Sequence, residues 1–500
     1  MNNGKICVSV CAETAGEFIE NTGRAESIAD VIELRFDCLA ESELENALEK
    51  TCRLKTGKPL LLAFRPKEQG GRRDLSKKER EFFWCSGYDF CANWADVEPD
   101  LIETASHWLF EKLICSYHDF NGVPGNLDEI YENLKMSDAD VLKIAVQASN
   151  IADTIAVWKL LEKARKDNKQ IVPIAMSEAG KWTRILGLAH GALMTYAALE
   201  TGKETASGQL TAQDLIEIYR VKELDKQTEV YGIIGNPVSH SLSPYIHNTA
   251  FKFHNLNAVF VPFEVNDLDE FIKKFVREET REVELNFKGF AVTIPHKQQI
   301  IRHLDSIDET ARKIGAVNTV KIVDGKLHGF NTDAAGFIKP LKNVFGDLRD
   351  ARVAVFGSGG AARACVYALK QESATVTIFA RNFEKAKLLA EEFSADYKLP
   401  VENYDPFDIV INTTPLGMKG ANENETPLAG EQIKNVSLVY DLVYTPFETR
   451  LLREARNIGV PTLGGFAMLI AQAMEQFKIW TNLDAPMQEI SRGTLRKLNQ

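Results

Sequence analysis

The first part of the chain, up to about residue 220, repeats one pattern that limits the fold more than any other feature. Short apolar runs suited to buried strands alternate with amphipathic stretches whose apolar residues recur at helical spacing, such as ADTIAVWKLLEKARKDN. The apolar runs are CVSVCA from residue 7, DVIELRFD from 30, PLLLAFR from 59, WADVE from 94, KLICSYHDF from 112, VLKIAV from 141, IVPIAM from 171 and MTYAAL from 194. About eight strand–helix units in about 220 residues predict a closed (β/α)8 barrel, with a two-domain Rossmann arrangement as the alternative.

The whole chain has 500 residues, more than a single hydrophobic core usually supports, so two or three domains are expected. With 45% hydrophobic and 26% charged residues, its composition is that of an ordinary globular protein. The net charge of -11 argues against a nucleic-acid or anionic-membrane partner. The N-terminus enters a strand pattern without a basic or long apolar leader, and no apolar run is long enough to span a bilayer. A cytoplasmic protein is therefore expected.

The eight cysteines form no CxxC pair and no grouping with zinc-like spacing. Several lie inside the apolar runs, where a reduced thiol behaves as a small hydrophobic group. We therefore expect reduced, mostly buried thiols and no metal site. These cysteines are Cys7, Cys11, Cys38, Cys52, Cys85, Cys91, Cys115 and Cys365.

Polar side chains cluster where the apolar runs end, which is where barrel enzymes build their active sites. They are Glu33, Arg35, Asp37, Arg65, Asp96, Glu98, His118 and Asp119. Lys143 differs, because it stands inside the run VLKIAV, where a lysine meets water only if it points into a cavity. In an apolar, cation-lined pocket the neutral amine is favoured, and a neutral amine can attack a carbonyl to form a Schiff base. The alternative is a lysine that extends to solvent at a strand edge.

Six motifs in a fixed order give this part of the chain a family resemblance. ELRFD, FRPKEQGG, SYHDF, LKIAV, IAMSEAGKWTRILG and TASGQLT together resemble type I 3-dehydroquinate dehydratase. The resemblance implies that Lys143 forms the imine with the substrate ketone and that His118 is the general acid/base. It also implies substrate contacts at Ser9, Glu33, Arg35, Arg65, Arg184, Thr205 and Gln209.

Two positions depart from the pattern of this family. Gln69 stands where the family usually has glutamate, and this change is expected to weaken the orientation of His118. Thr205, Ala206 and Ser207 stand where the family usually has Ser-Ala-Pro. Because this second change replaces a proline, it is expected to alter only the stiffness of a lid.

The string YGIIGNPVSHSLSP, from Tyr231 to Pro244, begins a different unit. A β-branched run enters a Gly-Asn-Pro turn and is followed by short hydroxyl side chains, which suit a polyol ligand because each donates and accepts a hydrogen bond. Taken singly, such a serine is compatible with a solvated turn or a helix cap. The string is followed by GFAVTIPHK, GAVNT and GFNTDAAGF, and together they resemble shikimate dehydrogenase.

This second resemblance implies the residues of a reductase site. Lys297 would protonate the alkoxide that forms when a ketone is reduced, with Asp333 as its partner. Ser241 and Ser243 would hold the substrate carboxylate. The remaining implied substrate contacts are Thr293, Asn318, Tyr444 and Gln472, and the implied nicotinamide contacts are Leu442 and Gly465.

A glycine-rich turn lies in RVAVFGSGGAARACVYAL, between a predicted strand and a predicted helix. A lone GxGxxG motif is weak, but this context is that of a dinucleotide-binding turn, with the pyrophosphate at the helix N-terminus. At the end of the next strand the chain has Arg381 and Lys385, which suit a 2'-phosphate, so NADP is the expected cofactor. The family more often has Asn-Arg-Thr where this chain has Ala380, Arg381 and Asn382. The turn residues are Gly357, Ser358, Gly359, Gly360, Ala361 and Ala362.

The nucleotide-binding segment is expected to interrupt the substrate lobe, because Gln472 in the last long helix must reach the serines. The expected divisions are 1–222 for the barrel, 223–230 for a linker, 231–338 for the substrate lobe, 339–464 for the Rossmann domain and 465–500 for returning helices. Together the resemblances imply a fused α/β enzyme that dehydrates 3-dehydroquinate to 3-dehydroshikimate and reduces this to shikimate with NADPH.

Two alternatives remain open at this point. The second half could act on quinate or use NAD, or the chain could be a sensor that binds these metabolites without turnover. Retention of Lys143, His118, Lys297 and Asp333 argues against a sensor, since a sensor has no need of a Schiff-base lysine. The sequence sets no oligomeric state.

Overall fold

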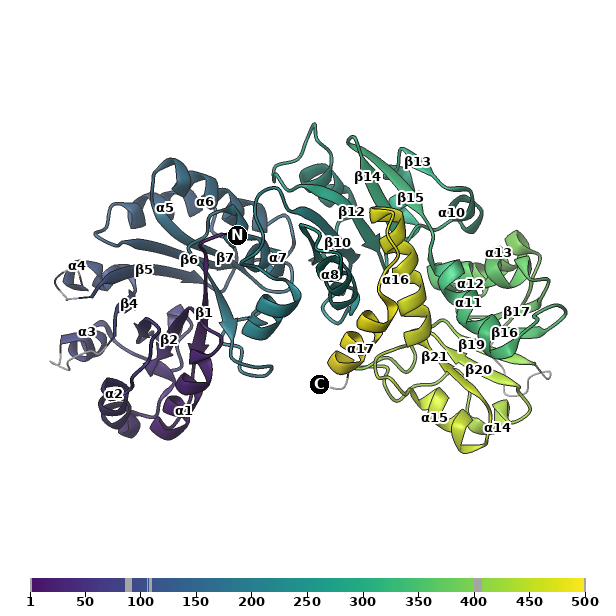
Figure 1. Cartoon of the computed structure of the whole chain (residues 1–500), viewed down its shortest axis with the longest axis horizontal. Helices are drawn as coiled ribbons and strands as arrows, with labels where there is room; N and C mark the ends of the chain where they lie inside the picture. Colours follow the sequence, from purple (N-terminus) through teal and green to yellow (C-terminus); the bar gives the residue numbers. More distant parts are fainter. Residues whose placement is uncertain (1, 86–91, 106, 108–109, 400–406, 499–500) are drawn as a thin grey trace. The chain divides into compact units, whose positions relative to one another are not determined.

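The computed structural model describes residues 2–85, 92–105, 107, 110–399 and 407–498 (Figure 1). The chain forms two compact units, each described here by itself. The first contains Met1–Val230, Pro237–His240 and Asn257–Asn286, and the second contains Tyr231–Asn236, Ser241–Leu256 and Phe287–Gln500.

The first unit is built on parallel strands, and the eight strands expected from the sequence are all present. They follow one another around the sheet in the order β7-β6-β5-β4-β3-β2-β1-β8-β9. The backbone N–H of Leu193, the residue before β8, donates to the carbonyl of Ile171 on β7 at 2.9 Å. The strands are β1 (Lys5–Val10), β2 (Val31–Arg35), β3 (Leu60–Ala63), β4 (Trp94–Val97), β5 (Lys112–Asp119), β6 (Val141–Gln147), β7 (Gln170–Met176), β8 (Met194–Ala198) and β9 (Leu210–Thr211).

One buried cluster draws a side chain from each of these eight strands, which is the interior of a barrel. Its members include Cys7, Val31, Leu61, Trp94, Ile114, Val141, Val172 and Met194. The α/β barrel prediction is therefore confirmed, and the two-domain Rossmann alternative for this part of the chain is wrong. The helices that follow the strands are α1 (Ala15–Glu26), α2 (Leu44–Cys52), α3 (Lys77–Cys85), α4 (Ile102–Ala105), α5 (Leu127–Lys135), α6 (Thr154–Lys166) and α7 (Lys181–Leu186).

The cysteine prediction is wrong at one pair. Cys11 and Cys38 form a disulfide, with their Cα atoms 5.4 Å apart. Each follows the end of a strand, β1 or β2, and these strands are parallel neighbours, so the fold brings together residues 27 positions apart. Cys7, Cys115 and Cys365 are buried free thiols as expected, whereas Cys52 and Cys85 are exposed. Cys91 lies outside the described residues.

The segment Asn257–Asn286 belongs to the first unit and packs on α7. It contains β11 (Ala258–Glu264) and α9 (Leu268–Phe271). The Trp182 ring lies 6.2 Å from the Phe263 ring and 5.8 Å from the Phe275 ring. This aromatic cluster attaches the segment to the barrel.

The second unit begins with a mixed sheet in which neighbouring strands follow the order β10-β12-β14-β15-β13. The β12/β14 and β14/β15 pairs are antiparallel. Helix α8 (Ser243–Phe253) and the long helix α16 (Gly465–Thr481) pack on it, with Trp480 Nε1 donating to the Val320 carbonyl at 3.0 Å. The strands are β10 (Glu229–Gly235), β12 (Phe287–Val292), β13 (Ser306–Ile307), β14 (Thr319–Val323) and β15 (Lys326–Phe330).

A parallel sheet with the order β18-β17-β16-β19-β20-β21 completes the second unit. Its order reverses at β16, so the carboxyl ends of β16 and β19 flank a topological switch point, where such sheets bind ligands. Helices α11 (Asp333–Phe345), α12 (Gly360–Gln371) and α13 (Phe383–Phe393) belong to this region. The strands are β16 (Arg352–Phe356), β17 (Thr375–Phe379), β18 (Asp396–Lys398), β19 (Ile409–Asn412), β20 (Leu438–Asp441) and β21 (Thr462–Gly464). Among the described residues of the whole chain, none of the helices has the length and apolar character needed to cross a membrane.

Candidate active sites

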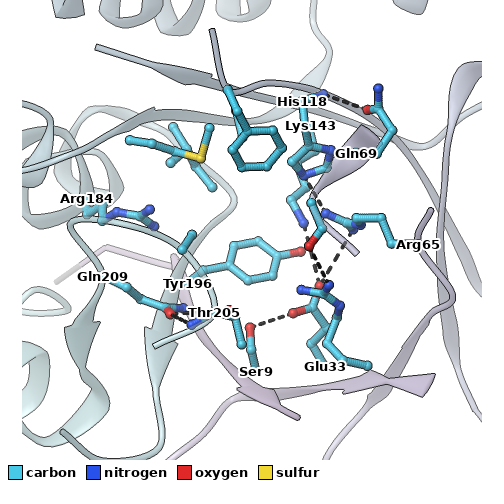
Figure 2. Close-up of a pocket in the computed structure, with 17 residues that line it drawn as sticks. Ser9, Glu33, Arg65, Gln69, His118, Lys143, Arg184, Tyr196, Thr205 and Gln209 are labelled. Atoms are coloured by element: carbon cyan, nitrogen blue, oxygen red, sulfur yellow. Dashed lines mark hydrogen bonds and ion pairs between the residues drawn. The ribbon is translucent and has the colours of Figure 1, made fainter. Parts of the chain in front are cut away.

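The first site is a pocket at the carboxyl ends of the barrel strands (Figure 2). All nine residues that the sequence placed in the first active site line it: Ser9, Glu33, Arg35, Arg65, His118, Lys143, Arg184, Thr205 and Gln209. The sequence did not single out Tyr196, Phe120, Ile174 or Met176, which also line it. Period-two alternation along the strands aims these side chains inward, and that signal could have indicated Tyr196.

Lys143 is only 3% exposed, and its amine lies deep in this pocket. Its Nζ donates to Asp96 Oδ2 at 2.8 Å and lies 3.6 Å from Glu33 Oε1. Burial lowers the pKa of Lys143, and the nearby Arg65 guanidinium lowers it further, while the two carboxylates oppose this. The sequence predicted a pocket lined by cations around Lys143. This prediction is wrong in one respect, because two carboxylates also face the lysine.

Arg65 connects the charged groups of the site. Its Nη2 lies 2.6 Å from Asp96 Oδ2, and its Nη1 donates to His118 Nε2 at 2.5 Å. Burial opposes the ionised form of Asp96, but the Arg65 and Lys143 cations outweigh it and hold the pKa of this carboxyl at about 2. Asp96 is therefore an anion at neutral pH; the sequence placed it among the polar strand-end residues but assigned it no role.

His118 is held as a neutral imidazole. Burial lowers the pKa of His118 well below its ordinary value, and the Arg65 and Lys143 cations add to this effect. An arginine can only donate, so Nε2 accepts from Arg65 and is the basic atom of the ring. Gln69, which departs from the family pattern, accepts the backbone N–H of His118 through its side-chain oxygen at 2.9 Å.

Two arginines of the pocket differ in whether a carboxylate of the protein already pairs with their guanidinium group. Arg35 is engaged by the protein, because it forms two 2.8 Å bonds to Asp37 and one of 3.0 Å to the Gly70 carbonyl. Arg184 is 4% exposed, and among the described residues no carboxylate pairs with it. Burial lowers the pKa of Arg184 to about 10. A buried guanidinium without a counter-ion is suited to an anionic ligand group.

Short polar bonds fix the remaining predicted residues of this pocket. The Ser9 hydroxyl donates to Glu33 Oε2 at 2.5 Å. The Gln209 side-chain oxygen accepts from the Thr205 backbone N–H at 2.8 Å and lies 3.3 Å from the Thr205 hydroxyl. These two residues belong to the segment in which Ser207 replaces the proline that the family usually has. Their hydrogen bonds hold this segment together without that proline.

The second site is a pocket lined entirely by residues of the second unit. It brings together all six predicted substrate residues, the predicted lysine–aspartate pair and three predicted cofactor residues. They are Ser241, Ser243, Thr293, Asn318, Tyr444, Gln472, Lys297, Asp333, Ala361, Leu442 and Gly465. The helix α16 residue Gln472 thus faces the same pocket as the two serines at the start of α8, as the sequence required.

Lys297 and Asp333 form the centre of this pocket, with Nζ and Oδ2 2.5 Å apart. The other carboxylate oxygen of Asp333 accepts from Asn318 Nδ2 at 2.8 Å. Asp333 begins helix α11, and the Asn331 side chain fixes that turn by accepting the Asp333 N–H at 3.0 Å. The Lys297 carbonyl accepts the backbone N–H of Val317 at 2.7 Å, which ties the lysine loop to the asparagine loop.

The glycine-rich turn lies beside this pair. Gly357 follows β16 with φ +123°, and a Cβ there would stand 2.3 Å from the Thr413 hydroxyl, so only glycine fits. A Cβ on Gly360 would lie 3.2 Å from the Lys297 side chain, whereas Gly359 faces open space. Helix α12 begins at Gly360 and is 12 residues long. The open backbone N–H groups of such a start fit a pyrophosphate.

The predicted phosphate-binding side chains lie at the end of β17. Arg381 and Lys385 are both exposed. Asn382 caps helix α13 by accepting the Lys385 N–H at 3.0 Å. The turn residues Gly357, Ser358, Gly359, Gly360 and Ala362, with Arg381 and Lys385, are not among those that line the second pocket. Over the residues that the structure describes, no group of side chains is arranged to hold a metal ion.

A buried lysine at the mouth of a barrel, together with a lysine–aspartate pair beside a dinucleotide-binding turn, defines a two-site α/β enzyme. Models of four families match the chain in order. They are type I 3-dehydroquinase at residues 6–226, shikimate dehydrogenase substrate binding domain at 233–320, shikimate / quinate 5-dehydrogenase at 340–418 and shikimate 5'-dehydrogenase C-terminal domain at 465–490.

A relative from Arabidopsis thaliana is similar over nearly the whole chain. This bifunctional 3-dehydroquinate dehydratase/shikimate dehydrogenase, chloroplastic, is 36% identical over 97% of this chain and 83% of its own length. The chain therefore belongs to the family of bifunctional 3-dehydroquinate dehydratase/shikimate dehydrogenases.

Two further relatives match the second half. Shikimate dehydrogenase (NADP(+)) from Methanococcus maripaludis is 41% identical over 52% of this chain and 94% of its own. A crystal structure of shikimate dehydrogenase in complex with NADP+ is 37% identical, covers 55% of this chain and 98% of its own, and has a TM-score of 0.51.

Proposed function

We propose that the barrel dehydrates 3-dehydroquinate to 3-dehydroshikimate and that the second unit reduces 3-dehydroshikimate to shikimate with NADPH. The observation that carries the first activity is the buried Lys143 amine, whose pKa is lowered while it faces a pocket. The observation that carries the second is the contact between Lys297 and Asp333 beside the glycine-rich turn.

In the first reaction, the neutral amine of Lys143 attacks the substrate ketone, and the adduct takes up a proton from solvent and loses water to give a protonated imine. The positive charge on this nitrogen makes the neighbouring C–H bond acidic. Neutral His118 takes that proton at Nε2 and returns it to the departing hydroxyl, which leaves as water. Hydrolysis of the imine then frees 3-dehydroshikimate and restores the amine.

The other residues of the first pocket would bind and orient the substrate. The Arg184 Nε has no hydrogen-bond partner among the described residues and its Nη2 reaches only the Ser207 carbonyl, at 3.4 Å, which supports the assignment of this guanidinium to the substrate carboxylate. Arg65 and Asp96 would keep the charge around Lys143 balanced during imine formation. The residues assigned to the ring hydroxyls and to closure of the pocket are Ser9, Glu33, Arg35, Thr205 and Gln209.

In the second reaction, the reduced nicotinamide supplies a hydride to the ketone carbon. Lys297 donates a proton from Nζ to the oxygen as it becomes an alkoxide, and Asp333 orients the ammonium. Ser241 and Ser243 are assigned to the substrate carboxylate. The ring hydroxyls are assigned to Thr293, Asn318, Tyr444 and Gln472.

NADP is proposed as the cofactor because the end of β17 offers Ala380, Arg381 and Asn382 and no acidic residue for a free ribose hydroxyl. The cations Arg381 and Lys385 suit a 2'-phosphate. The residues proposed to hold the pyrophosphate are Gly357, Ser358, Gly359, Gly360, Ala361 and Ala362, and those beside the nicotinamide are Leu442 and Gly465.

The domain limits and the location are likewise proposals. The limits proposed are 1–222, 223–230, 231–338, 339–464 and 465–500, and limited proteolysis would test them. A cytoplasmic location is proposed, whereas the Arabidopsis relative is named chloroplastic. Cell fractionation would separate these compartments.

One assay tests the whole proposal. The protein is given 3-dehydroquinate and NADPH, and both 3-dehydroshikimate and shikimate are followed over time. Transient 3-dehydroshikimate followed by shikimate is expected. Replacing NADPH by NADH, or the substrate by quinate with oxidised cofactor, tests the alternatives of NAD use and quinate specificity. Binding of these metabolites with no turnover would instead identify a sensor.

A further inference from the structure

Tyr196 lies at the centre of the first pocket, although nothing in the proposed reaction uses it. It stands in the middle of β8, is 4% exposed, and lines the pocket with Lys143. The Lys143 Nζ lies over its ring, 3.9 Å from the ring centroid. Figure 2 shows the tyrosine ring beside the space into which Lys143, His118 and Arg65 point. This distance is well within the range at which an aromatic face attracts a cation.

The charged neighbours of Lys143 come from several strands, and each also serves another partner. Asp96 on β4 is shared with Arg65, and Glu33 on β2 accepts from Ser9. Arg65 after β3 disfavours the lysine cation. The remaining titratable neighbours are His118 on β5, which is held neutral, and the buried thiol Cys7 on β1. Among the described residues, the Tyr196 face has no cation over it other than Lys143.

The nitrogen of Lys143 carries positive charge twice in imine chemistry. In the fraction of free enzyme molecules in which Lys143 is protonated, this nitrogen is an ammonium. After the imine with the substrate has formed, it is an iminium. The iminium is the electron sink for the reaction, and an unprotonated imine is a much poorer one, so whatever stabilises a cation at Nζ raises the fraction of the adduct that can lose its proton. In a buried pocket this attraction is stronger than at the surface, because water does not compete.

We propose that the Tyr196 ring is the face that stabilises positive charge on the Lys143 nitrogen during imine catalysis. This inference rests on the proposed dehydratase function. It assigns a role to the aromatic ring and none to the hydroxyl.

The tyrosine itself offers the matched control. Its hydroxyl is buried and has no hydrogen-bond partner among the described residues. Tyr196→Phe therefore keeps the ring face over Nζ and removes only an unpaired group. Tyr196→Leu and Tyr196→Met remove the aromatic face and keep an apolar side chain. Two replacements of different shape are used so that a packing defect in one does not decide the result.

The first measurement needs no substrate. The pKa of Lys143 is obtained from the pH dependence of its acetylation rate, followed at that residue by mass spectrometry. Losing the ring should lower this pKa by about 0.5 to 1.5 units in the Leu and Met variants, because the ammonium loses its cation–π partner. The Phe variant should stay within about 0.3 units of wild type, well inside the smaller expected shift.

The second measurement lowers the electron density of the ring in steps while the shape of the ring stays nearly constant. Phenylalanines with one, two and three ring fluorines are placed at position 196. Dehydration turnover should fall stepwise along this series, reaching roughly a 3- to 30-fold loss at the most fluorinated ring. Equal turnover and equal lysine pKa across the series would overturn the inference. A loss in Tyr196→Phe as large as in Tyr196→Leu would overturn it as well, because the hydroxyl would then be the active part.

Failure of the proposed function would look different. Borohydride reduction of wild-type protein with 3-dehydroquinate should leave a covalent adduct on Lys143. Absence of that adduct would refute the imine chemistry itself. An adduct on Lys143 with no trend along the fluorinated series would refute only the role of Tyr196.

Discussion

At the scale of single residues, the first site depends on a histidine that stays neutral. Burial lowers the pKa of His118, and Arg65 and Lys143 lower it further. The folded protein therefore resists protonation as pH falls through about 6.5, where an unfolded histidine would bind a proton. Because the unfolded state then binds more protons, this residue makes the barrel less stable below about pH 6.5, and the neutral base persists.

NMR titration of the histidine ring protons checks this. The His118 resonance, assigned by its loss in His118→Gln, should not shift between about pH 8 and about pH 5.5. Imidazole added to the same samples serves as the internal reference for a freely titrating ring. A His118 titration centred between about pH 6 and 7 would contradict the neutral-base assignment.

In the second site, Lys297 and Asp333 are proposed to act as a pair. If Lys297 only bound substrate, Lys297→Ala would weaken affinity and leave turnover unchanged. As proton donor it should cost about a hundredfold or more in turnover. Asp333→Asn should also slow turnover, and the double variant should be little worse than the worse single one, since the two act as a unit. Steady-state kinetics with saturating shikimate and NADP measures this, and simply additive losses would refute the pair. The dehydratase rate of the same samples is the control.

The residues that the sequence could predict are those whose type is unusual for their surroundings. A lysine inside VLKIAV and serines after a strand end draw attention without any structure. Tyr196 was missed because tyrosine is an ordinary strand residue, and Asp96 was placed among the polar strand-end residues without a role because aspartate is ordinary there. Only the barrel geometry brings them to the lysine nitrogen, from strands far apart in the sequence.

At the scale of elements, the strands were predictable because each parallel strand is buried on both faces and reads as a short apolar run. The Cys11–Cys38 disulfide was not predictable in this way. It depends on β1 and β2 being neighbours and on each cysteine lying just past its strand end. Which strands are neighbours is a property of the whole sheet, and it cannot be inferred from the spacing of the cysteines in the sequence.

The element proposed to set cofactor choice is the end of β17. Arg381→Ala should raise the KM for NADPH by about one to two decades and leave the KM for NADH nearly unchanged, because only NADPH carries the 2'-phosphate. Arg352→Ala is the matched control, since Arg352 is an exposed arginine at the opposite end of the neighbouring strand and pairs with Asp408. Initial rates with both cofactors measure this. Equal losses for NADPH and NADH would instead give Arg381 a structural role.

At the scale of the whole molecule, each active site is complete within one compact unit. The residues of the first pocket all belong to the first unit, and those of the second pocket all belong to the second. Neither site therefore needs side chains of the other to carry out its chemistry. We expect each single-site variant, Lys143→Ala or Lys297→Ala, to lose one activity and keep the other.

The same separation predicts how the intermediate moves. Equal concentrations of Lys143→Ala and Lys297→Ala are mixed, so that working sites of each kind match those in wild type. If 3-dehydroshikimate leaves the first site into solution, the lag before steady shikimate production depends only on the concentration and kinetics of the second site. The mixture and wild type should then show the same lag and the same final rate. Stopped-flow recording of NADPH loss after addition of 3-dehydroquinate measures both quantities. A shorter lag in wild type would mean that the intermediate passes between sites of one chain, since in the mixture no chain has both.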